Sequence, residues 1–184
     1  MDYIPTARDV LSNRVILPEG VKLQSLKTLD DSRGSLTEIF RDEWGLGPRP
    51  LQWNVVRSEA NVLRGVHAHR SHIDYLAMIS GEMVLCLHDL RPSSPTHRRS
   101  LLLRLQGHDL HLAVVPVGVA HGFYFPEAAC LVYSVSHYFD GADEFGCRWD
   151  DPDLAVAWPC QDPLLSPRDR TAGSYDEMNV ALGL

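Results

Sequence analysis

Several signals that often assign a function are missing from this sequence of 184 residues. Its four cysteines, Cys86, Cys130, Cys147 and Cys160, form no CxxC pair and lie far apart, which excludes a zinc ribbon, disfavours a disulfide framework and predicts free thiols. There is no GxSxG nucleophile elbow and no P-loop, and the GxG at residues 45–47 lacks the strand-to-helix context of a dinucleotide site. Those enzyme classes are therefore excluded.

Long apolar runs and basic clusters are also missing. The N-terminal "MDYIPTARDV" is interrupted by charge and proline, and no window approaches the ~20 apolar residues of a membrane span. Lys and Arg number 17 against 24 Asp and Glu, giving a net charge of −7, and no basic stretch is interleaved with aromatics. We expect a cytoplasmic protein with no membrane and no nucleic-acid partner. A small phosphorylated ligand stays compatible, because a few converging arginines can set the local potential.

What is present fits one compact domain. The hydrophobic content is 45%, and the chain contains no internal repeat, low-complexity tract or charge block that would mark a linker. We predict a single domain over residues 1–184, with an N-terminal arm over 1–24 and a C-terminal segment over 160–184.

Short segments rich in Val, Leu and aromatics dominate the pattern, and Gly, Pro, Asp or Ser separate them. Their spacing predicts a mainly β fold, and a double-sheet jelly roll satisfies it. Helical signals are weak, but Ser166 as N-cap and Pro167 at the first helical position predict a short helix near the C-terminus. The predicted strands cover residues 82–90, 100–106, 110–116 and 130–139.

One stretch, "LRGVHAHRSHIDYLAMISGE" at residues 63–82, has the spacing of a metal-binding jelly roll of the cupin type. His67 and His69 are two apart, so on one strand they face the same side, and Asp74 follows after four residues. Strand pairing can add His121 from "PVGVAHGF". Three imidazoles and a carboxylate suit Fe(II), Mn(II), Ni(II) or Zn(II), which makes His67, His69, Asp74 and His121 a candidate divalent metal site.

Each of these residues also has a simpler interpretation. A single histidine such as His72 or His88 is expected to be a surface or hydrogen-bonded residue, and Asp74 beside Tyr75 can simply face solvent.

A second set of motifs runs across residues 25–170 in one order. Together these motifs closely resemble the dTDP-4-dehydrorhamnose 3,5-epimerase family, and the ordered set is more specific than any one of them. The resemblance implies a cupin-like jelly roll, a homodimer and an activity that requires no metal. The motifs are "DSRGSLTEIF" (31–40), "LQWNVVRSEANVLRGVH" (51–67), "LRPSSPT" (90–96), "VPVGVAHGF" (115–123), "LVYSVSHYF" (131–139), "FGCRWDDPDLAVAWP" (145–159) and "LSPRD" (165–169).

The resemblance also implies catalytic roles. The family removes and returns protons beside the C4 ketone of a nucleotide-linked 4-keto-6-deoxyhexose; His67 matches its base, Asp169 the carboxylate that orients that base, and Tyr133 the opposing acid. A carboxylate on one imidazole nitrogen fixes the tautomer and raises the basicity of the other nitrogen. Without the resemblance, Asp169 would be a helix cap and Tyr133 a core-facing strand aromatic.

Substrate-binding residues follow from the same resemblance. They match positions around the nucleotide diphosphate and the sugar, where the forked, permanently charged donors of arginine are suited to phosphate. Taken singly, each arginine would be a surface residue. The expected substrate-binding residues are Arg33, Glu38, Gln52, Asn54, Arg64, His121 and Tyr138.

Two positions depart from the family pattern. His69 stands where the family usually has Gln, and Asp74 stands where it usually has a Lys that would neutralise the sugar enolate or the phosphates. Because the same two changes complete the candidate metal set, a bound divalent cation could restore the missing positive charge. His67, however, cannot ligate a metal with the nitrogen that abstracts a proton.

Our main interpretation is an isomerase: an epimerase that inverts C3, C5 or both in a nucleotide-linked 4-keto-6-deoxyhexose. One alternative keeps the fold but makes the protein a metal-dependent cupin enzyme, an oxygenase, isomerase or lyase, on a different substrate. Another is a sugar-binding module without catalysis, which would have no need for a base, its orienting carboxylate and an opposing acid.

Overall fold

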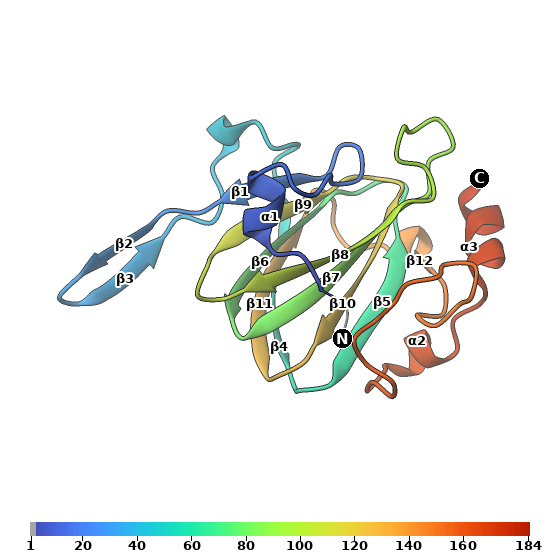
Figure 1. The fold of residues 1–184 in the computed structure, drawn as a ribbon. Coiled ribbons are helices and arrows are strands. Elements are labelled where there is room, and N and C mark those ends of the chain that lie inside the picture. Colours follow the sequence, from blue (N-terminus) through green and yellow to red (C-terminus); the bar gives the residue numbers. More distant parts are fainter. Residues whose placement is uncertain (1–2) are drawn as a thin grey trace.

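A computed structural model describes residues 3–184 and shows a mainly β domain with short helices (Figure 1). In chain order the elements are α1 (Ala7–Leu11), β1 (Lys22–Ser25), β2 (Thr28–Asp31), β3 (Gly34–Thr37), η1 (Asp42–Trp44), β4 (Gln52–Ser58), β5 (Val62–Ala68), β6 (Asp74–Ser80), β7 (Glu82–Asp89), β8 (Ser100–Gln106), β9 (His111–Val115), β10 (Val119–Phe125), β11 (Ala129–Val135), η2 (Gly141–Asp143), β12 (Phe145–Gly146), α2 (Pro167–Arg170) and α3 (Tyr175–Leu182).

Two five-stranded sheets face each other. One has the strand order β1-β9-β6-β11-β4 and the other β12-β5-β10-β7-β8, and neighbouring strands in both are antiparallel. Because successive side chains alternate between faces, each strand sends every second residue between the sheets. The architecture is the cupin-like jelly roll that the sequence predicts.

The predicted strands agree with the observed ones except at one end. β7, β8 and β9 lie within a residue of their predicted limits, whereas β11 ends at Val135 rather than at residue 139. The reason is pairing: at Val135 β11 meets the first residues of both neighbours, Gln52 of β4 and Asp74 of β6. Beyond that point no partner strand continues, and the chain leaves the sheet.

The apolar core has three layers, of which two position the site and the third includes Leu46, Tyr75 and Leu112. Leu76, Leu85 and Phe125 fill the space between the two sheets with no exposed surface. A second layer, with Trp158 and Met178, packs the C-terminal segment against the outer face of the β5, β10 and β7 strands. Burying a large apolar side chain contributes about 1.5–3 kcal/mol, so this second layer fixes the C-terminal segment, and α2 with it, beside β5.

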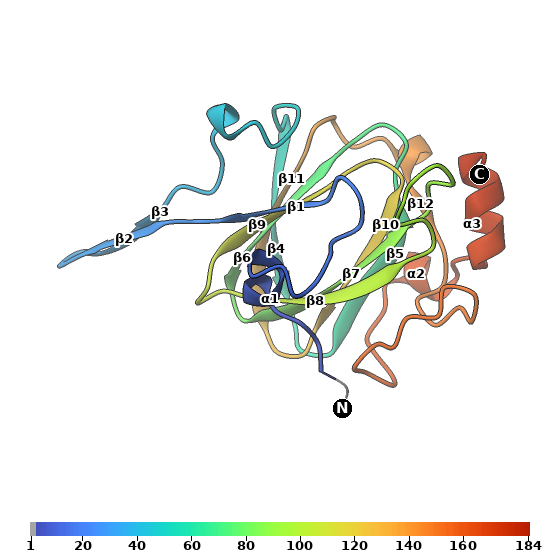
Figure 2. The same cartoon turned by 45° about the horizontal axis from the view of Figure 1, so that its top comes forward.

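The β2–β3 hairpin is the part of the chain that extends away from the barrel (Figures 1 and 2). The preceding segment instead packs on the barrel: β1 pairs with β9, and the amide of Arg104 in β8 donates to the carbonyl of Pro5 at 2.8 Å. The expected N-terminal arm over 1–24 therefore lies, in its described part, against its own sheet.

All four cysteines are free, as predicted. In the described part of the chain, no helix is long and apolar enough to cross a membrane.

Candidate active site

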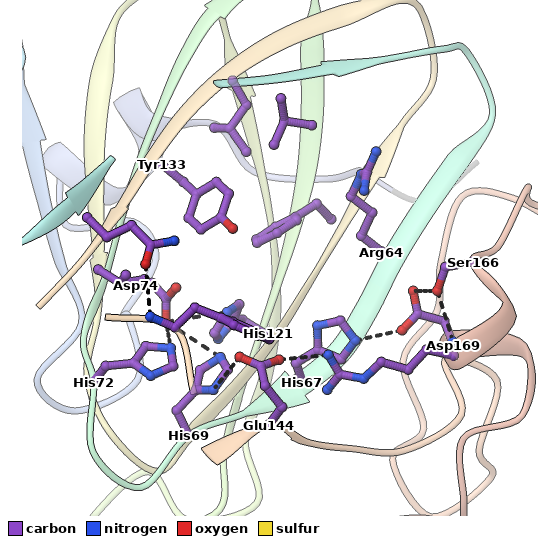
Figure 3. A pocket seen from close by; sticks show the side chains of 17 residues that line it. Arg64, His67, His69, His72, Asp74, His121, Tyr133, Glu144, Ser166 and Asp169 are labelled. Carbon is purple, nitrogen blue, oxygen red and sulfur yellow. Dashed lines mark hydrogen bonds and ion pairs between the residues drawn. The ribbon is translucent and has the colours of Figure 1, made fainter. Parts of the chain in front are cut away.

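A pocket of about 300 Å³ opens between the two sheets (Figure 3). Its walls come from β4, β6 and β11 of one sheet, from β5 and β10 of the other, and from the segments around η2 and α2. Polar and titratable side chains line it. They include Gln52, Arg64, His67, His69, His72, Asp74, His121, Tyr133, Glu144, Arg168 and Asp169.

His67 and Asp169 form a hydrogen-bonded pair on one side of the pocket. Nε2 of His67, in β5, lies 2.6 Å from Oδ1 of Asp169, in α2. The Asp169 side chain is 5% exposed and that of His67 is 21% exposed, so the carboxylate is buried behind the imidazole. Because a carboxylate accepts, Nε2 carries the hydrogen. Nδ1 is then the ring nitrogen with a free lone pair, and it has no hydrogen bond to any of residues 3–184.

The N-cap of α2 holds Asp169 in place. Oγ of Ser166 accepts from the amide of Asp169 at 3.0 Å and donates to Oδ2 of the same residue at 2.9 Å. The predicted helix start, with Ser166 as cap and Pro167 next, is confirmed. Burial would raise the pKa of Asp169, but the hydrogen bonds from His67 and Ser166 outweigh burial and hold that pKa below its ordinary value. Asp169 is thus both part of the capped first turn and the partner of His67.

Gly65 brings β5 close to β10. A Cβ at this position would lie 2.7 Å from Cα of Gly122 and 2.9 Å from the carbonyl oxygen of His121, and its φ is +115°. Only glycine combines that backbone angle with so close an approach. Two residues further on, His67 pairs in register with His121, so both imidazoles reach the same pocket.

Tyr133 faces the pair from the opposite sheet. It lies in β11, between Leu76 and Asn54 in register, and Figure 3 shows its hydroxyl turned into the pocket. Burial, followed by the nearby carboxylates of Asp74 and Glu144, raises the pKa of Tyr133 above its ordinary value. The phenol therefore holds its proton at neutral pH and can act as an acid.

A second group of titratable side chains, the histidine cluster, consists of His69, His72, Asp74 and His121. All four residues are buried, with 3–6% of their surface exposed. Nε2 of each histidine approaches Oδ2 of Asp74, at 3.8 Å for His69 and 3.7 Å for both His72 and His121 (Figure 3). Burial lowers the pKa of His69 and His121 to about 4 and raises that of Asp74 to about 6.

The segment around η2 supports the histidine cluster. The carbonyl oxygen of Asp143 accepts a hydrogen bond from Nδ1 of His69 at 2.9 Å. Oδ2 of the same residue accepts one from Nδ1 of His72 at 3.0 Å. Glu144 connects the two halves of the pocket: Oε1 lies 3.6 Å from Nδ1 of His69, and Oε2 lies 2.7 Å from the guanidinium of Arg168. Arg168 is the residue before Asp169, so the cluster and the pair share one polar wall.

The structure changes the composition of the candidate metal set. His69 and Asp74 have donor atoms within 4.8 Å of one another and of His72, whereas His121 is outside this group and Nε2 of His67 is hydrogen-bonded to Asp169. His72, expected at the surface or singly hydrogen-bonded, is 5% exposed. It comes into the cluster because residues 70–73 turn back between β5 and β6 and Asp143 holds its ring.

The substrate-binding candidates fall into two groups. Gln52, Arg64 and His121 line the pocket. Asn54 lies beside Gln52, whose Nε2 donates to Oδ1 of Asn54 at 3.2 Å. These four residues share the pocket region with His67.

The other three candidates lie outside the pocket of their own chain. Arg33 sits in the turn of the β2–β3 hairpin, where its guanidinium pairs with Asp31 at 2.5 Å. Glu38 follows the hairpin and pairs with Arg41 at 3.3 Å. Tyr138 is 72% exposed, although the next residue, Phe139, does line the pocket.

Nine pocket residues are not among those that the sequence predicts for the site: Val56, His72, Phe123, Leu131, Val135, Phe139, Glu144, Ser166 and Arg168. Glu144 lies in a loop without periodicity, so nothing in the sequence alone places it, whereas Phe139 ends the motif "LVYSVSHYF" and could have been considered. Arg168 could have been considered because it adjoins Asp169 in "LSPRD".

The geometry defines the class of the protein. An imidazole that is oriented by a buried carboxylate, with a phenol on the opposite wall, is an arrangement for moving protons at a bound molecule. The fold and the site together define a cupin-like jelly roll with an acid–base pocket.

The chain belongs to the dTDP-4-dehydrorhamnose 3,5-epimerase family, whose model matches residues 17–177. A dTDP-4-dehydrorhamnose 3,5-epimerase of Streptomyces griseus is 33% identical over 176 residues, covering 90% of this chain and 87% of the relative. A relative of the same name from Neisseria gonorrhoeae is 33% identical over 177 residues, and the match covers 92% of this chain but 51% of that longer protein. A dTDP-4-dehydrorhamnose 3-epimerase of Streptomyces niveus is 34% identical over 137 residues, covering 72% and 66%.

Solved structures agree with this assignment. An rmlC epimerase of Mycobacterium tuberculosis superposes with a TM-score of 0.84 at 29% identity, covering 90% of this chain and 89% of that one. A 3'-monoepimerase from Streptomyces bikiniensis, in complex with dTDP-quinovose, superposes with a TM-score of 0.82 at 29% identity, covering 92% and 90%. The chain is thus an epimerase of the isomerase class, and the comparisons favour this interpretation over a metal-dependent cupin enzyme acting on a different substrate.

Proposed function

We propose that the protein inverts C3, C5 or both in a nucleotide-linked 4-keto-6-deoxyhexose, with His67 as base and Tyr133 as the opposing acid. The observation that carries the proposal is the 2.6 Å hydrogen bond between His67 and Asp169, with Tyr133 on the facing sheet. The names of the relatives, which include both 3,5- and 3-epimerases, support the choice of reaction.

The chemistry follows from the ketone. A carbonyl at C4 acidifies the hydrogens on the neighbouring carbons, and Nδ1 of His67 takes one of these hydrogens as a proton, leaving an enolate. Asp169 stabilises the resulting imidazolium through the hydrogen bond at Nε2. Tyr133 then gives its phenolic proton to the same carbon from the other side, which inverts that carbon and collapses the enolate to the ketone.

Binding residues complete the proposal. Arg64, at the exposed edge of the pocket, is suited to a phosphate oxygen of the nucleotide diphosphate because its guanidinium is a forked, permanent cation. Gln52 and Asn54 offer amide groups to the sugar hydroxyls, and His121 lies on the pocket wall beside the reacting carbons. Arg64, Gln52 and His121 are supported by their positions in the pocket wall as well as by the family resemblance, and Asn54 is supported by its hydrogen bond with Gln52.

Arg33 and Glu38 fit the proposal through a homodimer, whereas Tyr138, exposed beside the lining residue Phe139, stays a prediction of the family resemblance. The β2–β3 hairpin extends away from its own barrel, and the cross-strand pair Leu29 and Leu36 is exposed by 55% and 61%. An exposed apolar pair on an extended hairpin favours burial against another chain. In this arrangement the hairpin of one copy delivers Arg33 and Glu38 to the pocket of the other.

Sedimentation velocity with a double variant, Leu29→Asp and Leu36→Asp, tests the homodimer. The wild type should sediment as a dimer and the variant as a folded monomer with weakened substrate affinity. Wild-type protein that stays monomeric at micromolar concentration would contradict the assembly.

Incubation with a panel of nucleotide-linked 4-keto-6-deoxyhexoses in deuterated water tests the reaction. Each exchanged centre adds one mass unit, so a shift of one unit indicates a single epimerised carbon and a shift of two indicates both. A panel in which no sugar gains mass would overturn the proposal. The location in the cytoplasm stays a prediction of the sequence.

A further inference from the structure

The histidine cluster has distances that suit coordination rather than hydrogen bonding. Nε2 of His69, His72 and His121 lie 3.7–3.8 Å from one atom, Oδ2 of Asp74. Hydrogen bonds between such atoms measure about 2.7–3.2 Å. Two donors bonded to one ion at about 2.1 Å lie roughly 3 to 4 Å apart. One donor atom each from His69, His72 and Asp74 lie within 4.8 Å of one another, so these three residues can share a central ion, and His121 is outside this group.

The other nitrogen of each ring shows which atom is free to coordinate. Nδ1 of His69 lies on the carbonyl oxygen of Asp143 at 2.9 Å, and Nδ1 of His72 lies on Oδ2 of the same residue at 3.0 Å. Nδ1 of His121 lies on the carbonyl oxygen of Val119 at 3.3 Å. Carbonyl and carboxylate oxygens only accept, so each Nδ1 carries the hydrogen. In a neutral imidazole the lone pair is then on Nε2, the nitrogen that faces Asp74.

Two imidazole nitrogens, of His69 and His72, and a carboxylate oxygen of Asp74 thus lie together in a buried space. Such an arrangement repels itself unless a positive charge lies between the donors. Within residues 3–184 no Lys or Arg lies within ion-pair distance of Asp74, and only the three imidazoles approach its carboxylate that closely. Each ring is held from behind by an acceptor, which is the outer-shell pattern of imidazoles that ligate a metal.

We propose that Nε2 of His69 and His72 and Oδ2 of Asp74 bind one divalent first-row transition metal ion, of the class of Zn(II), Co(II), Fe(II) or Mn(II). Two imidazoles with one carboxylate suit these borderline ions better than Mg(II) or Ca(II), which prefer oxygen ligands. His67 is not a ligand, because its Nε2 is committed to Asp169. The same histidine therefore does not have to serve both as base and as ligand.

The site opens on the pocket that holds His67 and Tyr133. Resting on the proposed function, the ion would serve as a Lewis acid for the C4 oxygen, where negative charge develops when a neighbouring proton leaves. The pocket's permanent cations do not serve this purpose in the free protein, since Arg168 pairs with Glu144 and Arg64 stands at the exposed edge.

Titration of chelator-stripped full-length protein with Co(II) alone tests the site. We expect one ion per chain and visible absorption bands of a nitrogen-rich centre. His72→Ala and Asp74→Asn should each weaken Co(II) binding by about 100-fold, because each removes a ligand. The control variant His108→Ala, in an exposed turn, should bind like the wild type.

Zn(II) supplies a check on folding. Thermal unfolding should show a higher Tm for the wild type with excess Zn(II) and no Zn(II) effect for Asp74→Asn, whose side chain keeps the size of the original. Wild-type protein that binds no Co(II), or an affinity unchanged in both His72→Ala and Asp74→Asn, would overturn the site.

Deuterium exchange on the sugar panel separates this inference from the proposed function. Exchange that disappears on metal removal and returns with Zn(II) or Co(II) would support the ion's place in the reaction. Stripped protein that exchanges at the full rate would remove the ion from the reaction and leave the epimerase intact. Metal binding without exchange on any sugar would instead contradict the proposed function.

Discussion

The pocket contains two sets of histidine and aspartate that differ in one distance. Nε2 of His67 lies 2.6 Å from the carboxylate of Asp169, whereas the three imidazoles around Asp74 stop at 3.7–3.8 Å. At the shorter distance a shared hydrogen joins the two groups; at the longer one no hydrogen bond forms, and the donor atoms of His69, His72 and Asp74 lie close enough together to share an ion. Identical residue types thus give a proton-transfer pair in one place and a candidate coordination site in the other.

The supporting contacts account for this difference. Asp169 is directed at Nε2 of His67 by the capped turn of α2, which leaves Nδ1 free. In the cluster the acceptors hold Nδ1 instead, two of them on Asp143, which leaves Nε2 free. In each imidazole, the nitrogen that is hydrogen-bonded to the surrounding protein carries the hydrogen. The other nitrogen keeps its lone pair and is the one that can bind a proton or a metal ion.

The largest expected effect comes from breaking the pair. His67→Asn should lower kcat by about 10³-fold, since loss of a general base typically costs a reaction 10²–10⁴-fold. Co(II) uptake should not change, because His67 is outside the proposed ligand set. A variant that loses both activity and Co(II) binding would show that the two sets are not separate.

Asp169→Asn should have the next largest effect, about a 10²-fold loss of kcat, because a neutral amide no longer stabilises the imidazolium. The variant should also differ in acid stability. Native contacts hold the pKa of Asp169 below its unfolded value of about 3.8, so its ionised form stabilises the fold above pH 4, and this contribution is lost as pH falls further. Urea titrations should show the wild-type advantage at pH 6 shrinking below pH 4; an advantage independent of pH would contradict this account.

Gly65→Ala tests the close approach of β5, which carries His67, to β10, which carries His121. We expect a loss of about 3 kcal/mol in the free energy of unfolding, because the added Cβ meets the backbone of β10. At this chain length that corresponds to a fall in Tm of roughly 6–12 °C. Gly141→Ala is the matched control, because a Cβ there meets nothing within 4 Å and should be nearly neutral. Equal Tm values for the two variants would contradict the close approach of β5 and β10.

The smallest effect is expected at the cap of α2. Ser166→Ala and Ser174→Ala each remove an N-cap and should each cost about 1 kcal/mol of stability. Only Ser166 also donates to Asp169, so only its variant should lower kcat by a few-fold and alter the pH profile of the reaction. Ser174→Ala, at the cap of α3, keeps full activity if the account is right, and an equal loss of kcat in both variants would refute the positioning role of Ser166.

Local signals were sufficient for much of the fold. The strands over residues 82–90, 100–106 and 110–116 are short, apolar and bounded by turn residues, and Ser166–Pro167 is a strong local start for a helix. The end of β11 could not be predicted, because pairing with β4 and β6 decides it, and those strands start at Gln52 and Asp74. Residues that depend on a partner strand are outside the reach of local patterns.

The site shows the same limit. His67, Tyr133 and Asp169 were assigned through ordered motifs, and all three line one pocket. The sequence does not predict His72 as a site residue, because its position in the pocket depends on Asp143, which is 71 residues away in the chain and holds its ring. Likewise, no sequence pattern shows that Arg33 is carried on a hairpin that leaves its own barrel.

The central claim is that His67 takes a proton and Tyr133 returns one from the opposite side, and separate measurement of exchange and inversion tests it most directly. The wild type, His67→Asn and Tyr133→Phe would each be incubated with an accepted nucleotide-linked 4-keto sugar in deuterated water, and NMR would follow deuterium incorporation and stereochemistry together. We predict that the wild type exchanges and inverts, that His67→Asn does neither, and that Tyr133→Phe exchanges without inverting. Exchange at the wild-type rate in folded His67→Asn would contradict the account.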